Sequence, residues 1–523
     1  TSPFHGENTG SSPVGVTIRE RATDRVALFV CGQRQSPALA SAAAPVQGIT
    51  MLPARPRAVP SSRLGRLAGF GRLAGGIAGN VLGGGAREVL KGQKPDLPSL
   101  LLTPANARRL ADELARLRGA AMKMGQLISM DGGDVLPPEL AEIMGRLRAE
   151  ADPMPPTQLE QSLTAGWGPD WRTKLQRFDE RPIAAASIGQ VHRAVALDGR
   201  DLAIKVQYPG VAASIDADVN NVATLVKLSG LLPASFALEP LLDEAKRQLK
   251  EEADYAREAA MLARFGDLAA DWPDVVVPPL AADLSCPTIL AMGHVSGVAI
   301  DKASALPQAE RDRLMTLMLR ILMAELFDWG VMQTDPNFAN YRYDLNSGRL
   351  VLLDFGAARE VPASIREGYR ALLGSGLSGD DEGLLAAMAA IGILPSQAPP
   401  AMRDTILAMA RDGFAPLRME GPFDFGAGGL ASNLKDQSAS LIAAREHFTA
   451  PPPDILFIQR KIAGMYLLAA RLKARVDVAA LVRPYTAGRV QASTQPRATR
   501  AARRSGAIST DVSRDPPAGN TFA

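Results

Sequence analysis

The amino-acid sequence predicts an α+β fold of two lobes, with a small β-containing lobe followed by a larger helical lobe. The chain has 523 residues, more than one compact core usually organises, and 46% of them are hydrophobic. Short apolar strands are expected between residues 178 and 297, and helical periodicity dominates residues 298–488. We therefore place the N-lobe at 178–297 and the C-lobe at 298–488.

A catalytic signature lies in the second lobe. Asp335 is followed five positions later by Asn340, and Asp354-Phe355-Gly356 comes about a dozen residues further on. This spacing is typical of the protein kinases, in which the Asp of Asp-Phe-Gly and the Asn of the catalytic loop hold Mg²⁺ against the phosphates of ATP. We expect Asp354 and Asn340 to hold metal and Asp335 to orient or deprotonate the attacking group. The sequence thus predicts a kinase-like fold with ATP or ADP and Mg²⁺ as cofactors.

The flanking elements fit this interpretation. An apolar helix is expected at about residues 309–329, leading into the loop, and a short strand at 349–353 would deliver Asp354. The chain after Asp354 is expected to be helical to about residue 483.

Composition excludes several other classes. The formal net charge of +3 argues against a dedicated nucleic-acid binder. The two cysteines, Cys31 and Cys286, have no spaced partners, so neither a disulfide framework nor a zinc site is expected. No run reaches the roughly 18 apolar residues of a membrane-spanning helix. The nearest candidates, at 384–394 and 462–470, read as core helices.

The two ends of the chain have compositions typical of disorder, at residues 1–60 and 489–523. Because the chain begins with Thr1, we expect a processed form, a fragment or an over-extended gene model, with Met51 as a plausible start.

Residues 61–100 are basic and rich in glycine. Glycine recurs at every fourth position from Gly71 to Gly83, which would give a helix one smooth face. The segment is either a flexible linker or a membrane-proximal segment that lies on a lipid surface through its Arg and apolar side chains.

Residues 101–177 are expected to form a helical extension. One helix is predicted at 104–117, with Thr103 as its N-cap, and another at 138–148. Between them, Lys123 and Gln126 are three positions apart and share a helix face. From spacing alone, both would be surface residues.

The N-lobe offers two phosphate-binding candidates. A kinase covers its phosphates with a glycine-rich loop, but this chain has Ala184, Ala185, Ala186 and Ser187 at that place. Methyl groups stiffen the loop and limit how closely its backbone approaches phosphate. The strand at 202–206 carries one Lys, Lys205, which is expected to pair with the α- and β-phosphates.

Two long helices are expected next, at 211–228 and 238–268. A kinase needs a helical Glu to hold its strand Lys, and we expect Glu252 to hold Lys205. Glu251 and Arg257 are interpreted as parts of a solvated face. A strand at 288–295 would end the lobe near the hinge.

The C-lobe departs from protein kinases in three respects. Thr334 stands where Arg precedes the catalytic Asp, no Ala-Pro-Glu follows Asp354 at the usual distance, and nothing reads as an activation loop.

Taken together, these motifs resemble the UbiB (AarF) family of atypical kinase-like proteins, which support ubiquinone biosynthesis. The likeness runs from about residue 60 to 485 in the family's order. The matching residues are Lys123-Met124-Gly125-Gln126, Ala184 to Ser187, Lys205, Gln207 to Val211, Glu252-Ala253-Asp254, Gln333 to Asn340 and Asp354-Phe355-Gly356.

The resemblance implies roles that spacing alone does not. It makes Lys123 and Gln126 site residues, because the family's helical extension folds over the active site and its Lys meets the Glu-x-Asp acids. A protein substrate would then be blocked, which favours ATP hydrolysis or small-molecule phosphotransfer. The segment at 61–100 resembles the family's membrane-associating region. We expect peripheral attachment to membrane lipids at the cytoplasmic face of a bacterial inner membrane.

Three functions remain open at this point. The first is a Mg²⁺-ATP-binding ATPase that assists ubiquinone biosynthesis, with the enzymes of that pathway as partners and a homodimer as one oligomeric state. The second is a kinase for a protein or small metabolite. The third is a nucleotide-gated, lipid-binding scaffold. No nucleic-acid partner is expected.

Overall fold

The computed structural model describes residues 153–228, 238–335, 337–395, 398–428 and 452–486, together with residues 75, 117, 119–121, 123 and 124. Some earlier predictions lie outside these residues. They are residues 1–60, the helices at 104–117 and 138–148, Gln126, the tail at 489–523 and nearly all of 61–100.

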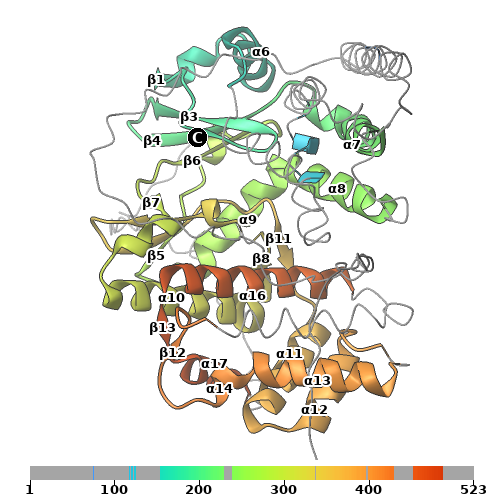
Figure 1. Ribbon diagram of the computed structural model, residues 1–523. Coiled ribbons are helices and arrows are strands. Elements are labelled where there is room, and N and C mark those ends of the chain that lie inside the picture. The colour runs from blue at the N-terminus through green and yellow to red at the C-terminus, as the bar shows by residue number, and fades with distance from the viewer. Residues whose placement is uncertain are drawn as a thin grey trace, which may run out of the picture.

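The described chain folds into the two predicted lobes, and the α+β class is confirmed. Figure 1 shows the strands of the N-lobe at the top and the helices of the C-lobe below. Helix α9 (Tyr255–Leu268) and the antiparallel pair of β8 (Val331–Gln333) and β11 (Ala358–Glu360) lie where the lobes meet.

The N-lobe sheet is antiparallel, in the order β1-β3-β4-β6, with β2 paired to β3. Helix α6 precedes it, and β1 begins at Leu175, slightly before the predicted boundary. The bounds are α6 Pro156–Trp167, a 3₁₀ turn at Trp171–Lys174, β1 Leu175–Phe178, β2 Ala184–Ala185, β3 Gly189–Ala196, β4 Asp201–Gln207 and β6 Ile289–Gly293.

Alternation along β4 positions the lysine. Leu202, Ile204 and Val206 are fully buried on one face of the strand. Since side chains alternate between faces, Lys205 points the other way, toward the cleft between the lobes. Lys205 is opposite Val191 of β3 and Leu290 of β6, so it lies on an interior strand.

The helix predicted at 211–228 is confirmed as α7 (Val211–Leu228), but the helix predicted at 238–268 is two helices. Helix α8 (Glu239–Glu252) ends at Glu252, and α9 begins three residues later at Tyr255. The Asp254 carboxylate accepts the backbone N–H of Arg257 at 2.9 Å, so Asp254 is an N-cap that starts a new helix.

A second sheet has the order β5-β10-β9-β7. Its strands are β5 (Val275–Val276), β7 (Val298–Ala299), β9 (Tyr341–Asp344) and β10 (Arg349–Leu352). Residues 275–276, expected in the N-lobe, are therefore hydrogen-bonded to the C-lobe, parallel to β10. The strand predicted before Asp354 is confirmed as β10, which ends at Leu352, one residue earlier than expected.

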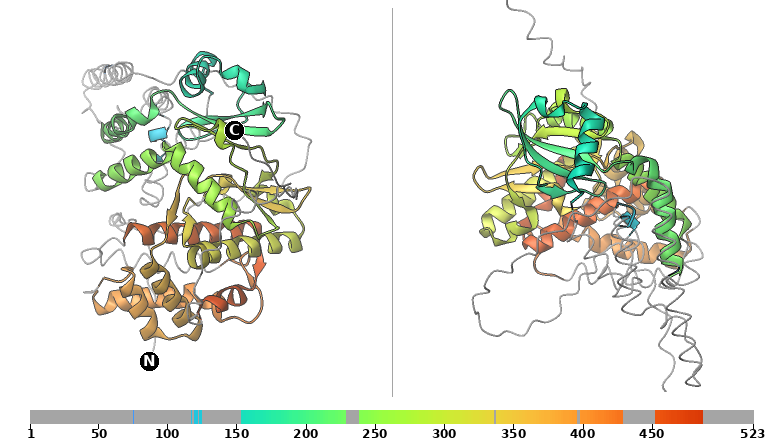
Figure 2. Two further views of the ribbon diagram at one scale, coloured as in Figure 1. Left: turned by 180° about the vertical axis from the view of Figure 1, so that it is seen from behind. Right: turned by 90° about the horizontal axis from the view of Figure 1, so that it is seen from above.

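The C-lobe is mainly helical. Helix α16 (Pro453–Leu472) contacts α10 (Gln308–Met323), and Figures 1 and 2 show the two side by side below the lobe junction. The other elements are 3₁₀ turns at Ala282–Leu284, Ile300–Ala305 and Phe338–Asn340, a π-helix at Ala324–Trp329, α11 Ala363–Ser378, α12 Asp381–Ala390, α13 Pro400–Gly413, α14 Ala415–Arg418, β12 Phe423–Asp424, β13 Arg475–Val476 and α17 Val478–Thr486.

Within these described ranges, no helix is both long and apolar enough to cross a bilayer. The apolar runs at 384–394 and 462–470 fall largely in α12 and α16, where Leu384 and Leu468 are fully buried.

An aromatic cluster joins α9 to the Asp-Phe-Gly motif. The Phe265 ring lies 4.7 Å from the Phe355 ring and 5.9 Å from that of Trp329, measured between centroids. Trp272 packs on Trp329 at 5.5 Å.

Replacing Phe265 with Ala should lower the free energy of unfolding by about 3–5 kcal/mol, because the fully buried ring would leave a cavity. Urea denaturation measures this. Leu197→Ala, at a 62% exposed position, is the control and should stay within about 0.5 kcal/mol. Equal effects of the two variants would contradict this account of the lobe junction.

Candidate active site

Lys205 is held by Glu258. Its ammonium donates to both carboxylate oxygens of Glu258 at 2.7 Å and lies 3.9 Å from Asp354 Oδ2. Burial would lower the pKa of Lys205, but the charges of Glu258 and Asp354 outweigh it and hold the pKa above its ordinary value. The lysine is therefore positively charged and faces the metal-binding candidate.

The prediction that Glu252 holds Lys205 is wrong. Glu252 instead accepts from Lys123 Nζ at 2.5 Å and from the hydroxyl of Ser187 in the alanine-rich loop. Glu252 closes α8, whereas Glu258 is one turn into α9, which the Asp254 cap reorients. Glu252 thus connects the extension to the loop.

The sequence carried a signal for Glu258 that was missed. The buried residues of α9 are Tyr255, Glu258, Leu262 and Phe265, spaced as one face of a helix. An acid within such an apolar stripe needs a buried partner, and Lys205 provides it.

The interpretation of Glu251 and Arg257 as solvated is also wrong. Arg257 donates to the carbonyl oxygens of Gly356, at 2.7 Å, and Ala358. Glu251 pairs with Arg359 of β11. Both residues therefore tie α8 and α9 to the segment that follows Asp354.

The catalytic loop brings Asp335 and Asn340 together. The Asn340 amide donates to Asp335 Oδ2 at 2.9 Å, and the Thr334 hydroxyl donates to the Ala357 carbonyl at 2.7 Å. Burial raises the pKa of Asp335, and nearby Asp354 adds to the rise, while Lys123 opposes it. Asp335 thus has the setting of a group that handles protons.

The alanine-rich loop is a tight turn at the edge of the sheet. Ala184 and Ala185 form β2, opposite Val191 and Gln190, and are exposed. The Ala186 N–H donates to the Gly189 carbonyl at 2.9 Å, so it is already paired. This is physically unlike an open glycine loop.

The oxygen ligands fit Mg²⁺ that arrives with a nucleotide. Asn340 donates an amide N–H to Asp335, which leaves the Asn340 amide oxygen available for a metal ion. The Asp354 side chain is 42% exposed. Among the described residues, no group of three or more His, Cys, Asp or Glu could hold a metal ion. Protein sites for Mg²⁺ often have one or two carboxylates and take their other ligands from phosphate and water.

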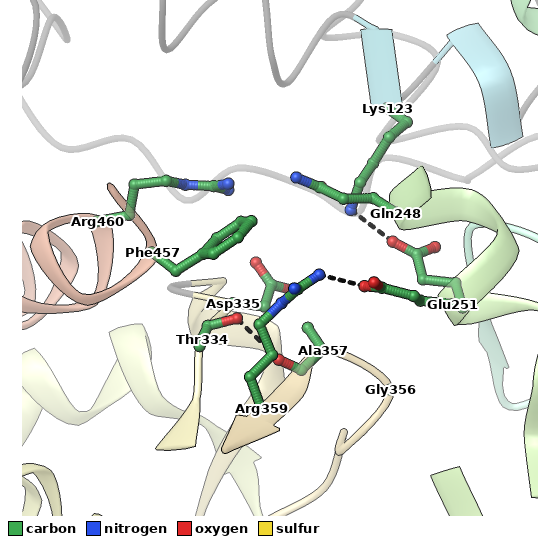
Figure 3. Close-up of a pocket in the computed structure, with 11 residues that line it drawn as sticks. Lys123, Gln248, Glu251, Thr334, Asp335, Gly356, Ala357, Arg359, Phe457 and Arg460 are labelled. Atoms are coloured by element: carbon green, nitrogen blue, oxygen red, sulfur yellow. Dashed lines mark hydrogen bonds and ion pairs between the residues drawn. The ribbon is translucent and has the colours of Figure 1, made fainter. Parts of the chain in front are cut away.

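A pocket opens beside Asp335 on the side of Lys123 (Figure 3). Its empty volume is about 320 Å³, part of it open to solvent. Thr334, Asp335 and Ala357 lie at one end, and the Arg359, Arg460 and Phe457 side chains face it. The Arg359 guanidinium lies 4.3 Å from the centroid of the Phe457 ring, which orients both groups.

The chain passes directly from Gly356 through β11 into α11, which begins at Ala363. The Val361 N–H donates to the carbonyl of Gly330, the residue before β8, at 2.9 Å. This bond joins the connection to the strand that leads into the catalytic loop. The predicted lack of an activation loop is confirmed over these residues.

Comparison with known proteins agrees with this geometry. A family model described as the ABC1 atypical kinase-like domain matches residues 146–388. Atypical kinase COQ8B, mitochondrial, of Rattus norvegicus is 37% identical over 424 residues, covering 81% of this chain and 80% of that protein. The chain belongs to the ABC1 (UbiB/AarF) family of atypical kinases.

Other matches extend the ABC1 assignment. Atypical kinase coq-8, mitochondrial, of Caenorhabditis elegans is 37% identical over 436 residues, but this chain spans only 57% of its length. A solved structure, the complex of Rv3197 with erythromycin from Mycobacterium tuberculosis, has a TM-score of 0.51 and 27% identity. It covers 72% of this chain and 94% of that one. The chain is therefore a kinase-class enzyme with the ABC1 fold.

Glu258→Gln should weaken Mg·ADP binding by roughly tenfold or more, because Lys205 would lose its charged partner. Glu252→Gln should change that affinity by less than about twofold, since it contacts Lys123 and Ser187 instead. Isothermal titration calorimetry measures both. A larger loss of affinity in Glu252→Gln than in Glu258→Gln would instead support the prediction that Glu252 holds Lys205.

Proposed function

We propose that this chain is a Mg²⁺-dependent atypical kinase that hydrolyses ATP, or transfers its terminal phosphoryl group to a small acceptor. The observation that carries the proposal is the convergence of Lys205, Asp335, Asn340 and Asp354 at the junction of the lobes. Family membership supports a kinase-like role in ubiquinone biosynthesis.

The residues divide the chemistry among them. Lys205, kept charged by Glu258, would bind the phosphates. Asp354 and Asn340 would hold Mg²⁺, which when bound neutralises developing charge on the phosphoryl oxygens. Asp335 would orient a water or hydroxyl for in-line attack and accept its proton.

The acceptor side favours small groups. Lys123 and Glu252 close one side of the pocket, and the short connection from Gly356 to Ala363 provides no activation segment on which an extended peptide could rest. An ATPase or small-metabolite kinase agrees with this closed side and this short connection better than a protein kinase does.

Peripheral membrane attachment belongs to the same proposal. Its support is the basic, glycine-rich composition of residues 61–100. Membrane lipids and enzymes of ubiquinone biosynthesis are the proposed partners, and attachment to the inner face of a bacterial membrane stays a prediction.

ATP hydrolysis with and without anionic liposomes tests the function. Asp335→Asn should reduce kcat by about 10²-fold or more while Mg·ADP still binds, because it removes the group that orients and deprotonates the attacking water. Asp354→Asn should nearly abolish metal-dependent nucleotide binding. Asp344→Asn, a matched change at the half-buried last residue of β9, should retain both. Intact nucleotide binding in Asp354→Asn would count against the assignment.

The pH dependence gives a second test. Asp335 must be ionised to act, and its pKa is raised. As the pH is lowered, activity should therefore be lost at a higher pH than it would be for an exposed aspartate with a pKa of about 3.9. The acidic limb of kcat/KM for Mg·ATP reports this group in the free enzyme. A limb at or below about pH 4 would contradict the role.

A further inference from the structure

A buried lysine lies beneath the catalytic loop. Lys461 of α16 is 2% exposed, and its ammonium has three hydrogen-bond acceptors. They are the Gln333 carbonyl at 2.7 Å, the Gln333 side-chain oxygen at 2.9 Å and the Tyr341 hydroxyl at 2.5 Å. These groups belong to Gln333 and Tyr341, which are 128 and 120 positions earlier in the chain.

The charge of Lys461 is balanced by Glu325. This carboxylate is 1% exposed and comes from the π-helix at Ala324–Trp329. Its Oε2 lies 3.4 Å from Lys461 Nζ, and its Oε1 accepts the Gln333 N–H at 3.2 Å. A buried ammonium without a counter-charge would be strongly unfavourable, so the two residues act as a pair.

The two anchor residues bracket the catalytic loop. Gln333 stands two positions before Asp335, and Tyr341 follows Asn340 directly. The Tyr341 hydroxyl also donates to the Gln333 side-chain oxygen at 2.9 Å, so the loop is closed at its base. One ammonium therefore holds both ends of a segment whose middle carries the catalytic groups.

We propose that Lys461 is a positioning residue that holds Asp335 and Asn340 in register for phosphoryl transfer, with Glu325 as its counter-charge. The inference rests on the proposed function. Lys461 acts through Gln333 and Tyr341, and a misplacement of about 1 Å in such a site costs on the order of 10²-fold in rate.

The helix that carries Lys461, α16, also lines the pocket. Phe457 and Arg460, on the same helix, line the pocket beside Asp335. The helix therefore contacts both the loop that carries the catalytic Asp and the space where an acceptor would bind. Movement of α16 would alter both together.

The test compares Lys461→Met, Glu325→Gln and the double variant in the full chain. We measure kcat and KM for ATP hydrolysis, Kd for Mg·ADP and Tm. Lys461→Met should lower kcat by roughly tenfold or more and weaken Mg·ADP binding by a smaller factor, because the lysine acts on the loop that carries Asp335 and Asn340 and does not contact Lys205 or Asp354.

The double variant separates positioning from stability. Removing both charges should recover Tm relative to Lys461→Met, because no buried carboxylate is left unpaired. It should leave kcat low, because the hydrogen bonds to Gln333 and Tyr341 are still missing. Recovery of kcat together with Tm would overturn the proposal, and so would a Lys461→Met variant with native kcat.

Arg471→Met is the matched control. Arg471 lies on the same helix, is 52% exposed and pairs with Asp301 at 3.1 Å at the surface. It should retain native kcat and Kd.

Hydrogen–deuterium exchange of residues 333–341 keeps the inference testable without turnover. If the native chain hydrolyses no ATP, the ATPase proposal fails and this exchange decides on positioning. Faster exchange in Lys461→Met, but not in Arg471→Met, supports it. Unchanged exchange overturns it.

Discussion

The ion pair of Lys205 and Glu258 is the constraint on which the nucleotide site depends. It joins an interior strand of the N-lobe to α9, with both oxygens of Glu258 at 2.7 Å from the ammonium. Helix α9 in turn holds the Asp-Phe-Gly segment, through Arg257 on the Gly356 carbonyl and through Phe265 on Phe355. A single helix therefore connects the strand that carries Lys205 to the segment that carries Asp354, the proposed metal ligand.

The C-lobe has a second buried polar centre, the pair of Lys461 and Glu325 below the catalytic loop. A catalytic loop must be rigid although its own backbone forms no long element. Here Lys461 pairs with Glu325 and donates to Gln333 below the loop, while Asp335 lines the pocket and accepts from Asn340. Each centre pairs a lysine with a buried glutamate: one holds the proposed phosphate ligand Lys205, and the other holds the catalytic loop.

The sequence was sufficient where a local pattern has one physical solution. Lys205 lies within an alternating apolar strand, Asp335 contacts Asn340, and a strand precedes Asp354, as expected, because strand period and loop length decide these positions. The roles of these residues in binding and catalysis stay predictions. These residues gave the cleft its phosphate, metal and catalytic candidates.

The errors arose where tertiary geometry decides between similar residues. Two acids six positions apart, Glu252 and Glu258, could each have reached Lys205, and the choice depends on the helix break at Asp254. Arg257 was interpreted as part of a solvated face, and Lys461 drew no prediction. Only the folded chain shows that both contact backbone carbonyls far away in the sequence. Long-range hydrogen bonds of this kind leave no periodic signal.

A structure of the chain with Mg²⁺ and a non-hydrolysable ATP analogue is the most direct test of the account. The account predicts phosphate oxygens within hydrogen-bonding reach of Lys205, which still contacts Glu258, and a metal ion bound by Asp354 and Asn340. A nucleotide bound away from Lys205, or a metal ion with no contact to Asp354, would contradict it.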